Sequence, residues 1–290
     1  MNEKLVVSTF ASVDDYQYFI PLFTYSIYKA YPDWKIKIFM SGRLADEIKV
    51  FLLDNTEIHE DIFLDYPVRE STCNTLRHLI PMKYFNGYDY VYNTDVDFIV
   101  FNHEMSHLNY YQKIMSETNL PYAGSRGPIR GFKRPEITLA WDGNYKRICS
   151  GCLMLKYPEF YERTKEARRK YREIIKKGED NSCTYREYDE VMFCRICAES
   201  GLRTPIEKNC FVGGRKFSAK YRDIHLGDFK FPKRYRNMDK MKRILHEDNV
   251  KKFLELEEDS DWQIRCNAMS QCEMVGSYLN KARKYINTRI

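Results

Sequence analysis

The stretch Tyr88-Asp-Tyr-Val-Tyr-Asn-Thr-Asp-Val-Asp-Phe-Ile-Val-Phe101 places two aspartates, Asp95 and Asp97, inside a run of apolar and aromatic residues. The first part of the stretch, 88–93, has the length and composition of a buried β-strand. Because side chains alternate along an extended chain, residues two apart point to the same face. Two carboxylates this close repel each other unless a positive charge lies between them.

A divalent metal ion is the simplest source of that charge. Mg²⁺ and Mn²⁺ typically keep one or two protein carboxylates and take substrate phosphates as further ligands. The alternative is the end of a surface strand that carries two aspartates and no ligand. We favour the metal, because the aspartates interrupt a run that otherwise has the pattern of a buried strand.

The rest of the chain alternates between strand-like and helix-like patterns. Strands are predicted at 5–10, 35–40, 61–64, 88–93 and 148–155. Helices are predicted at 19–30, 44–53, 72–85 (containing or broken by Pro81), 106–118, 158–177 and 187–199. This alternation predicts an α/β fold with a mostly parallel sheet flanked by helices. Ligands bind such open sheets at the carboxyl ends of the strands, where both Phe10 and the aspartate pair are expected.

Two further segments bear on the organisation of the chain. The glycine-rich and basic stretch 124–145 predicts a long loop that could cover a substrate. From 238 onward the pattern is helical and charged, with a break near 259–261. We therefore expect a main domain at 1–235 and a helical C-terminal extension at 236–290.

Composition limits the classes of function. The 290 residues are 43% hydrophobic, enough for a substantial core, and carry a net charge of +6. The basic residues can be solvated helix faces, or can attract an anionic donor or the surface of an anionic membrane. Nucleic-acid binding is not expected, because no reader motif is present. With no signal-peptide pattern and no apolar run of about 18 residues, we expect a cytoplasmic protein, with peripheral contact at the inner face of a membrane as an option.

Nine cysteines include two Cys-x-x-Cys pairs, Cys149/Cys152 and Cys194/Cys197. The first pair falls in a predicted strand and the second in a predicted helix, whereas structural zinc pairs usually lie on tight turns. We interpret them as free, mostly buried thiols, and a zinc-bound regulatory protein is the less favoured alternative.

Six motifs occur in order along the chain. They are Phe10-Ala-Ser-Val-Asp-Asp-Tyr16, Thr75-Leu-Arg-His-Leu79, Tyr88–Asp97, Cys149-Ser-Gly-Cys-Leu-Met-Leu155, Tyr188-Asp-Glu-Val-Met192 and His225-Leu-Gly-Asp-Phe-Lys230. In this order they resemble the GT-A-fold glycosyltransferases, most closely the retaining family-eight galactosyl- and glucosyltransferases. The resemblance covers about 5–230.

The resemblance implies a role for each matched position. Asp95, Asp97 and His225 would be metal ligands, with Asp95 also on the donor side. Lys230 would contact the diphosphate, and Arg77 the donor, although His78 could be meant instead. The residues that would hold uridine are Phe10, Ala11, Asp15 and Tyr16, with Tyr16 stacking on the base. The chemistry of the side chains agrees with these roles. A neutral imidazole is a good ligand for Mn²⁺, and a lysine ammonium is a suitable point charge for a phosphate.

Asp189 and Glu190 would face the sugar. An Asp-Glu pair resembles the related retaining family that makes blood-group-type α-galactosyl linkages. A carboxylate near the anomeric carbon can act as nucleophile or stabilise an oxocarbenium-like transition state. In the inverting alternative the same residue would be the general base, and the other alternative is a helix residue facing solvent.

These observations predict a metal-dependent glycosyltransferase that moves galactose or glucose from a UDP-sugar to a glycan or lipid-linked glycan, with Mn²⁺ or Mg²⁺ as cofactor. A non-catalytic sugar-binding domain on the same fold is the alternative from another class.

Overall fold

In this computed structural model, the structure describes residues 3–12, 14–66, 75–124, 151–178, 188–202, 221, 223–230 and 245–287. At 188–191 and at 230 it describes the backbone alone.

A six-stranded sheet forms the centre of the molecule, with the strand order β3-β2-β1-β4-β7-β6. Its members are β1 (Leu5–Ala11), β2 (Lys35–Met40), β3 (Thr56–His59), β4 (Tyr90–Thr94), β6 (Tyr122–Gly124) and β7 (Cys152–Lys156). The first four are mutually parallel, and β7 runs antiparallel to both β4 and β6. The predicted α/β architecture with a mostly parallel sheet is therefore confirmed.

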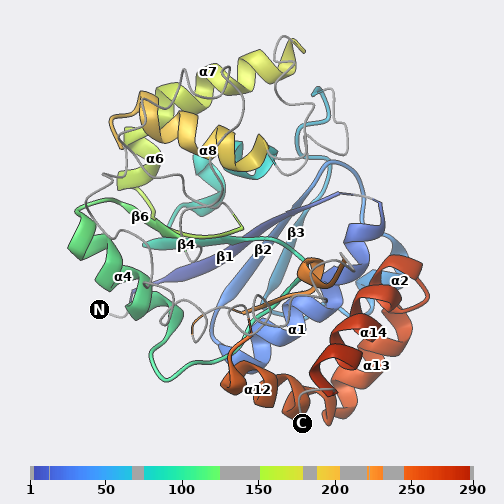
Figure 1. The fold of residues 1–290 in the computed structure, drawn as a ribbon. Coiled ribbons are helices and arrows are strands. Elements are labelled where there is room, and N and C mark those ends of the chain that lie inside the picture. Colours follow the sequence, from blue (N-terminus) through green and yellow to red (C-terminus); the bar gives the residue numbers. More distant parts are fainter. Residues whose placement is uncertain are drawn as a thin grey trace.

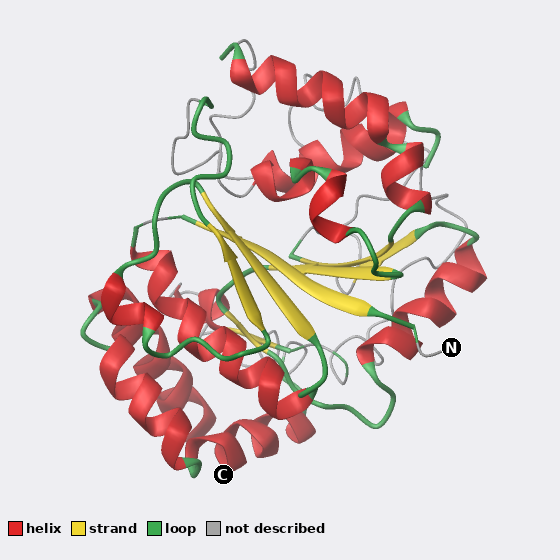
Figure 2. Ribbon diagram, turned by 180° about the vertical axis from the view of Figure 1, so that it is seen from behind, coloured by secondary structure: helices red, strands yellow, loops and turns green. Residues whose placement is uncertain are grey.

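Helices cover both faces of this sheet (Figure 1; Figure 2 shows the same layers from behind). On one face lie α1 (Ile20–Ala30), α12 (Glu247–Glu257), α13 (Ser260–Met269) and α14 (Glu273–Asn287). On the other lie α6 (Glu159–Arg163), α7 (Lys165–Lys176) and α8 (Tyr188–Glu199). Each face has its own apolar core, which explains why β1 is buried at all seven positions and has apolar residues on both sides.

Shorter elements connect these layers. The helices α2 (Asp46–Lys49) and α4 (His107–Thr118) follow β2 and precede β6, respectively. The 3₁₀ turns are η1 (Asp15–Phe19), η2 (Arg77–Leu79), η3 (Met82–Phe85) and η5 (Leu226–Lys230). A second, two-stranded sheet pairs β5 (Phe98–Ile99) antiparallel with β8 (Ile224–His225).

The predicted strand at 61–64 is wrong. The third strand is Thr56–His59, and the chain then turns back over the end of β2. Ile62 donates its N–H to the carbonyl of Met40 at 2.8 Å, and Asp61 and Phe63 have φ values of 57° and 65°. Positive φ is incompatible with an extended strand, so the apolar side chains here pack from a turn.

Three predicted helices are shorter or divided. The helix expected at 44–53 is reduced to α2. The described part of 72–85 is helical at 75–76 and continues as η2 and η3, separated at Pro81. The helix expected at 158–177 is divided at Thr164, whose hydroxyl bonds the carbonyl of Phe160 at 2.7 Å instead of leaving it to the helix ladder alone.

The predicted break near 259–261 is confirmed, and it ties the C-terminal helices to α1. Asp259 caps α13 by accepting the N–H of Trp262 at 3.0 Å. The same carboxylate accepts the Tyr25 hydroxyl at 2.6 Å and the Lys29 ammonium at 2.9 Å, both from α1. The fully buried Trp262 packs beside Tyr25, so these helices share the core of the sheet. A boundary at 235/236 lies outside the described residues and stays a prediction.

Among the described residues, no helix combines the length and the apolar character needed to cross a membrane.

We expect Asp259→Ala to lower the free energy of unfolding by about 1–2 kcal/mol at neutral pH, because it removes a helix cap and two charge-assisted bonds. Although burial opposes ionisation of Asp259, the hydrogen bonds from Tyr25 and Lys29 outweigh it and lower the pKa of Asp259 to about 2. A lowered folded-state pKa gives stability that is present above about pH 4 and lost as the pH falls toward 2.

Urea unfolding at a series of pH values measures both effects. The difference in the free energy of unfolding between wild type and Asp259→Ala should narrow below about pH 4. Asp261→Ala, at an exposed carboxylate in the same helix turn, is the matched control. A gap that stays constant down to pH 2 would contradict the assignment.

Candidate active site

Asp95, Asp97 and His225 meet at the carboxyl end of β4. One ligand atom from each lies within 4.8 Å of the others. Nε2 of His225 is 3.1 Å from Oδ1 of Asp97 and 3.9 Å from Oδ2 of Asp95. Asp97 is buried, whereas Asp95 and His225 are partly exposed. The structure thus brings together the three residues that the sequence predicts as metal ligands.

The two-stranded sheet formed by β5 and β8 places His225 at this position. β5 follows Asp97 directly, and its pairing with β8 sets Phe98 opposite His225. The N–H of Leu226 then bonds the carbonyl of Asp97 at 2.9 Å, extending the ladder by one step. Two segments far apart in the sequence are therefore held in register at the site.

Three neighbours fix the orientation of the His225 ring. Phe98 stacks on it with ring centroids 4.5 Å apart and planes 8° apart. Oδ1 of Asp228 lies 3.6 Å from Nδ1, which leaves Nε2 for the two aspartates. Burial opposes protonation, but Asp97 and Asp228 outweigh it and raise the pKa of His225. A carboxylate behind a ligating histidine is a common arrangement in metal sites.

Gly227 packs so closely against Asp97 and His225 that there is no room for a side chain. A Cβ at this position would lie 2.6 Å from Oδ2 of Asp97 and 2.9 Å from Nε2 of His225. Both distances are shorter than real Cβ contacts, so any side chain here would displace the ligand atoms. The requirement for glycine is therefore close packing against the site.

Arg77 supplies a fixed positive charge. It lies in η2, is 2% exposed, and donates from its guanidinium to Oδ1 of Asp95. His78, the other residue considered for this role, packs against Phe193, and its Nε2 accepts from Nε of Arg77 at 3.4 Å. Burial, with Arg77 and the nearby Arg168, lowers the pKa of His78. Of the two, Arg77 is the residue that reaches the aspartate pair.

Arg168 holds η2 in place from the other side. This buried side chain of α7 donates to the carbonyl oxygens of His78, at 2.9 Å, and of Ile80. Its guanidinium lies over the Tyr161 ring, 4.0 Å from the centroid. The contacts bracket η2, so Arg168 positions the turn that carries Arg77.

The residues expected to hold uridine lie at and beyond the carboxyl end of β1. Phe10 and Ala11 are buried at the end of the strand. Asp15 and Tyr16 begin η1, where Tyr16 is half-buried and its ring lies 5.9 Å from that of Phe19. Because β1 and β4 are parallel neighbours, this segment and the aspartate pair leave the sheet at the same edge.

Other predicted residues can be placed only in part. Asp189 and Glu190 lie in the first turn of α8, and Lys230 ends η5, but their side chains are outside the described residues. So are Cys149 and almost all of the predicted loop at 124–145. Of the remaining predicted cysteines, Cys152 is buried in β7, and Cys194 and Cys197 are buried one turn apart in α8. Their roles stay predictions.

Sequence reasoning missed several residues that the structure brings to notice. Asp228 lies three residues after His225, a spacing that could have indicated a supporting carboxylate. Arg168 carried no such signal, because a basic residue in a charged helix is normally solvated. A second group, His103, His107 and Asp223, contains a His-x₃-His spacing that is known from zinc sites.

No protein-family model and no curated protein matches the sequence. Among solved structures, the galactosyltransferase LgtC with donor and acceptor sugar analogues aligns with a TM-score of 0.42 at 13% identity, covering 68% of this chain and 70% of LgtC. The glycosyltransferase GlyE of Streptococcus pneumoniae TIGR4 aligns with a TM-score of 0.48 at 11% identity, covering 94% of this chain and 64% of GlyE. The bifunctional glycosyltransferase WbbM aligns with a TM-score of 0.44 at 13% identity, covering 68% of this chain and 38% of WbbM. A likeness this distant carries no argument about function.

We expect Gly227→Ala to weaken Mn²⁺ binding by about tenfold or more, because the new methyl group displaces Asp97 and His225. Isothermal titration of Mn²⁺ into the purified protein measures the change. Gly178→Ala is the matched control, because it strains a positive φ at the end of α7, far along the chain from the site, where a Cβ meets nothing within 4 Å. Wild-type affinity in Gly227→Ala would show that this close approach is not required.

Proposed function

We propose that this chain is a metal-dependent glycosyltransferase that moves a hexose, galactose or glucose, from a UDP-sugar to a hydroxyl of a glycan or lipid-linked glycan, with retention of configuration. The observation that carries the proposal is the convergence of Asp95, Asp97 and Nε2 of His225 within 4.8 Å at the carboxyl end of a central parallel strand. The ordered motifs that resemble GT-A glycosyltransferases support it.

The donor set fits Mn²⁺ well. Two carboxylates suit a hard divalent ion, and an imidazole nitrogen favours Mn²⁺ over Mg²⁺, which prefers oxygen ligands. The carboxylate of Asp228 behind His225 and the close approach of Gly227 to the ligand atoms support this assignment. When bound, the metal supplies positive charge that stabilises the diphosphate of the leaving UDP.

Protein groups would add to that charge. Arg77 already compensates Asp95 and carries a permanent positive charge suited to a phosphate oxygen. Lys230 lies at the end of the turn that begins next to His225, and we assign it to the diphosphate. The uracil and ribose would lie along Phe10, Ala11, Asp15 and Tyr16, on the same edge of the sheet.

Asp189 and Glu190 are assigned to the sugar. They lie in the first turn of α8. This helix packs against η2 and contributes to the apolar core on the face of the sheet covered by α6, α7 and α8. A carboxylate here would stabilise the positive character of the anomeric carbon as its bond to UDP breaks. Retention and inversion differ in whether such a carboxylate faces the sugar or deprotonates the acceptor.

Contact with an anionic membrane through a basic surface stays a prediction. The exposed basic residues of α7 are partly compensated, because Arg169 pairs with Glu166, Lys170 with Glu199 and Lys176 with Asp65. These three pairs reduce the positive charge that this face could offer to a membrane.

The decisive experiment measures Mn²⁺-dependent release of UDP from a panel of UDP-sugars. We expect wild type to hydrolyse one UDP-hexose preferentially, and Asp97→Asn to lower the rate by about 100-fold or more. Asp54→Asn, at an exposed aspartate before β3, is the control and should keep the wild-type rate. Equal rates in wild type and Asp97→Asn for every donor would refute the metal assignment.

The stereochemical part of the proposal has its own test. NMR of the anomeric proton in the first product formed from an α-linked UDP-hexose should show the α-anomer. A β-anomer as first product would replace retention by inversion, with Asp189 or Glu190 as general base.

A further inference from the structure

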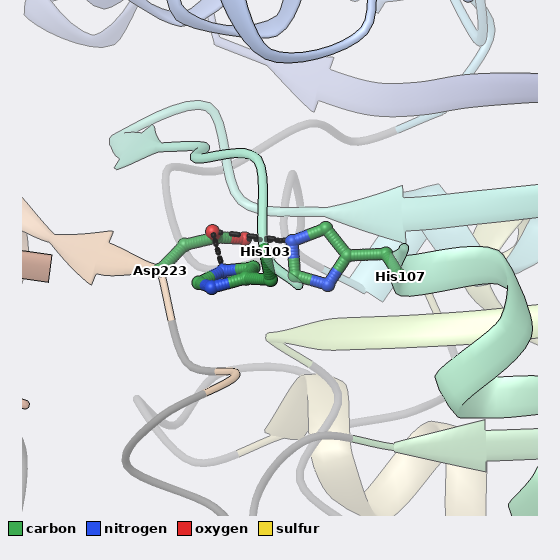
Figure 3. A group of neighbouring side chains, drawn as sticks. All are labelled: His103, His107 and Asp223. Carbon is green, nitrogen blue, oxygen red and sulfur yellow. Dashed lines mark hydrogen bonds and ion pairs between the residues drawn. The ribbon is translucent and has the colours of Figure 1, made fainter. Parts of the chain in front are cut away.

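Three buried side chains, His103, His107 and Asp223, form a second group whose ligand atoms lie within 4.8 Å of one another (Figure 3). His103 lies between β5 and α4, His107 is the first residue of α4, and Asp223 directly precedes β8. The group is distinct from the one formed by Asp95, Asp97 and His225, and the β5–β8 pair runs between the two. No role in the proposed glycosyl transfer uses it.

Burial makes a charge on this group energetically costly. The side chains of His103, His107 and Asp223 are exposed by only 1%, 0% and 1%. A carboxylate in such surroundings needs a compensating positive charge. Within the described part of the chain, its contacts are the two imidazoles, the N–H of Phe101 at 3.0 Å and the Tyr92 hydroxyl at 3.4 Å. None of these is a permanent positive charge, whereas a metal ion would provide one.

The spacing of the three side chains is that of metal ligands. Nε2 of His103 lies 3.4 Å from Oδ1 of Asp223, and Nε2 of His107 lies 3.2 Å from Oδ1 and 3.1 Å from Oδ2. Around zinc, with bonds of about 2.0–2.1 Å, tetrahedral ligand atoms are about 3.3 Å apart. Direct N–H···O hydrogen bonds span about 2.7–3.2 Å, so the His103 distance lies beyond that range and the two His107 distances lie at its upper end.

Both imidazoles direct Nε2 to the same carboxylate, as Figure 3 shows.

The surroundings distinguish zinc from redox-active iron. Two histidines and one carboxylate also hold iron in oxygenases, but those sites keep open positions for substrate and oxygen. Here aromatic rings enclose the group, with Tyr92 stacked on His107 at 5.5 Å and Tyr221 beside His103 at 5.6 Å. We propose that His103, His107 and Asp223 supply three ligands of a Zn²⁺ ion that joins the start of α4 to the start of β8.

Metal analysis tests this directly. The protein is made as His225→Ala in zinc-supplemented medium, which disables the first site, and is dialysed against metal-free buffer. Elemental analysis should then find about one equivalent of zinc per chain. Adding His103→Ala and His107→Ala should lower this by about tenfold or more, whereas adding His246→Ala, at the partly exposed cap of α12, should leave it unchanged.

Cobalt gives a readout that does not depend on enzymatic activity. Co²⁺ added to zinc-free His225→Ala protein should produce the strong visible absorption of a four-coordinate ion, and added zinc should abolish it. Absence of both zinc and this absorption in His225→Ala would overturn the proposal, even if the triple variant fails to fold. Iron in place of zinc would overturn it too. Either result leaves the Asp95/Asp97 site and the proposed transferase activity untouched.

Discussion

Two carboxylates at the end of β4 impose the main electrostatic constraint on this molecule. Asp95 and Asp97 follow a buried central strand and, together with His225, place their ligand atoms within 4.8 Å. Like charges in this position are tolerated only where positive charge is supplied locally. The chain supplies it from two directions, with Arg77 contacting Asp95 and His225 contacting Asp97. Neither partner is near the aspartates in sequence, so the site depends on how distant segments are held.

The Arg77 side depends on a second buried arginine. Arg168 is enclosed in the core beside α7, and burial lowers its pKa to about 10, so it remains charged at neutral pH. Carbonyl oxygens of η2 and the face of Tyr161 receive this charge. Burying a guanidinium is costly unless its donors are used. Its donors bond the backbone next to Arg77 and so tie η2 to α7.

Much of the scaffold could be predicted from the sequence, because its signals are local. Residues 5–10 are an apolar run, 19–30 have helical spacing and 35–40 alternate, and these segments become β1, α1 and β2. The aspartate pair was visible for the same reason, since two charges interrupt a strand pattern. The error at 61–64 shows the limit of local patterns. Ile62 and Phe63 are apolar because they pack on the core beneath α6, α7 and α8, yet they do so from a turn with positive φ. The weakly patterned edge strand at Thr56–His59 gave no comparable signal.

The parts of the site that sequence could not reveal depend on tertiary register. Asp97 precedes β5 and His225 ends β8, while Asp223 precedes β8 and lies against the chain that follows β5. One antiparallel pair therefore has a carboxylate–imidazole group at each end. A slip of one residue would turn every side chain of β8 to the opposite face and would break both groups together. A two-residue strand has few ladder bonds of its own with which to resist such a slip. The buried contacts of Asp223 with His103 and His107 add to that resistance, so both ends of the pair hold the register that places His225 beside Asp97.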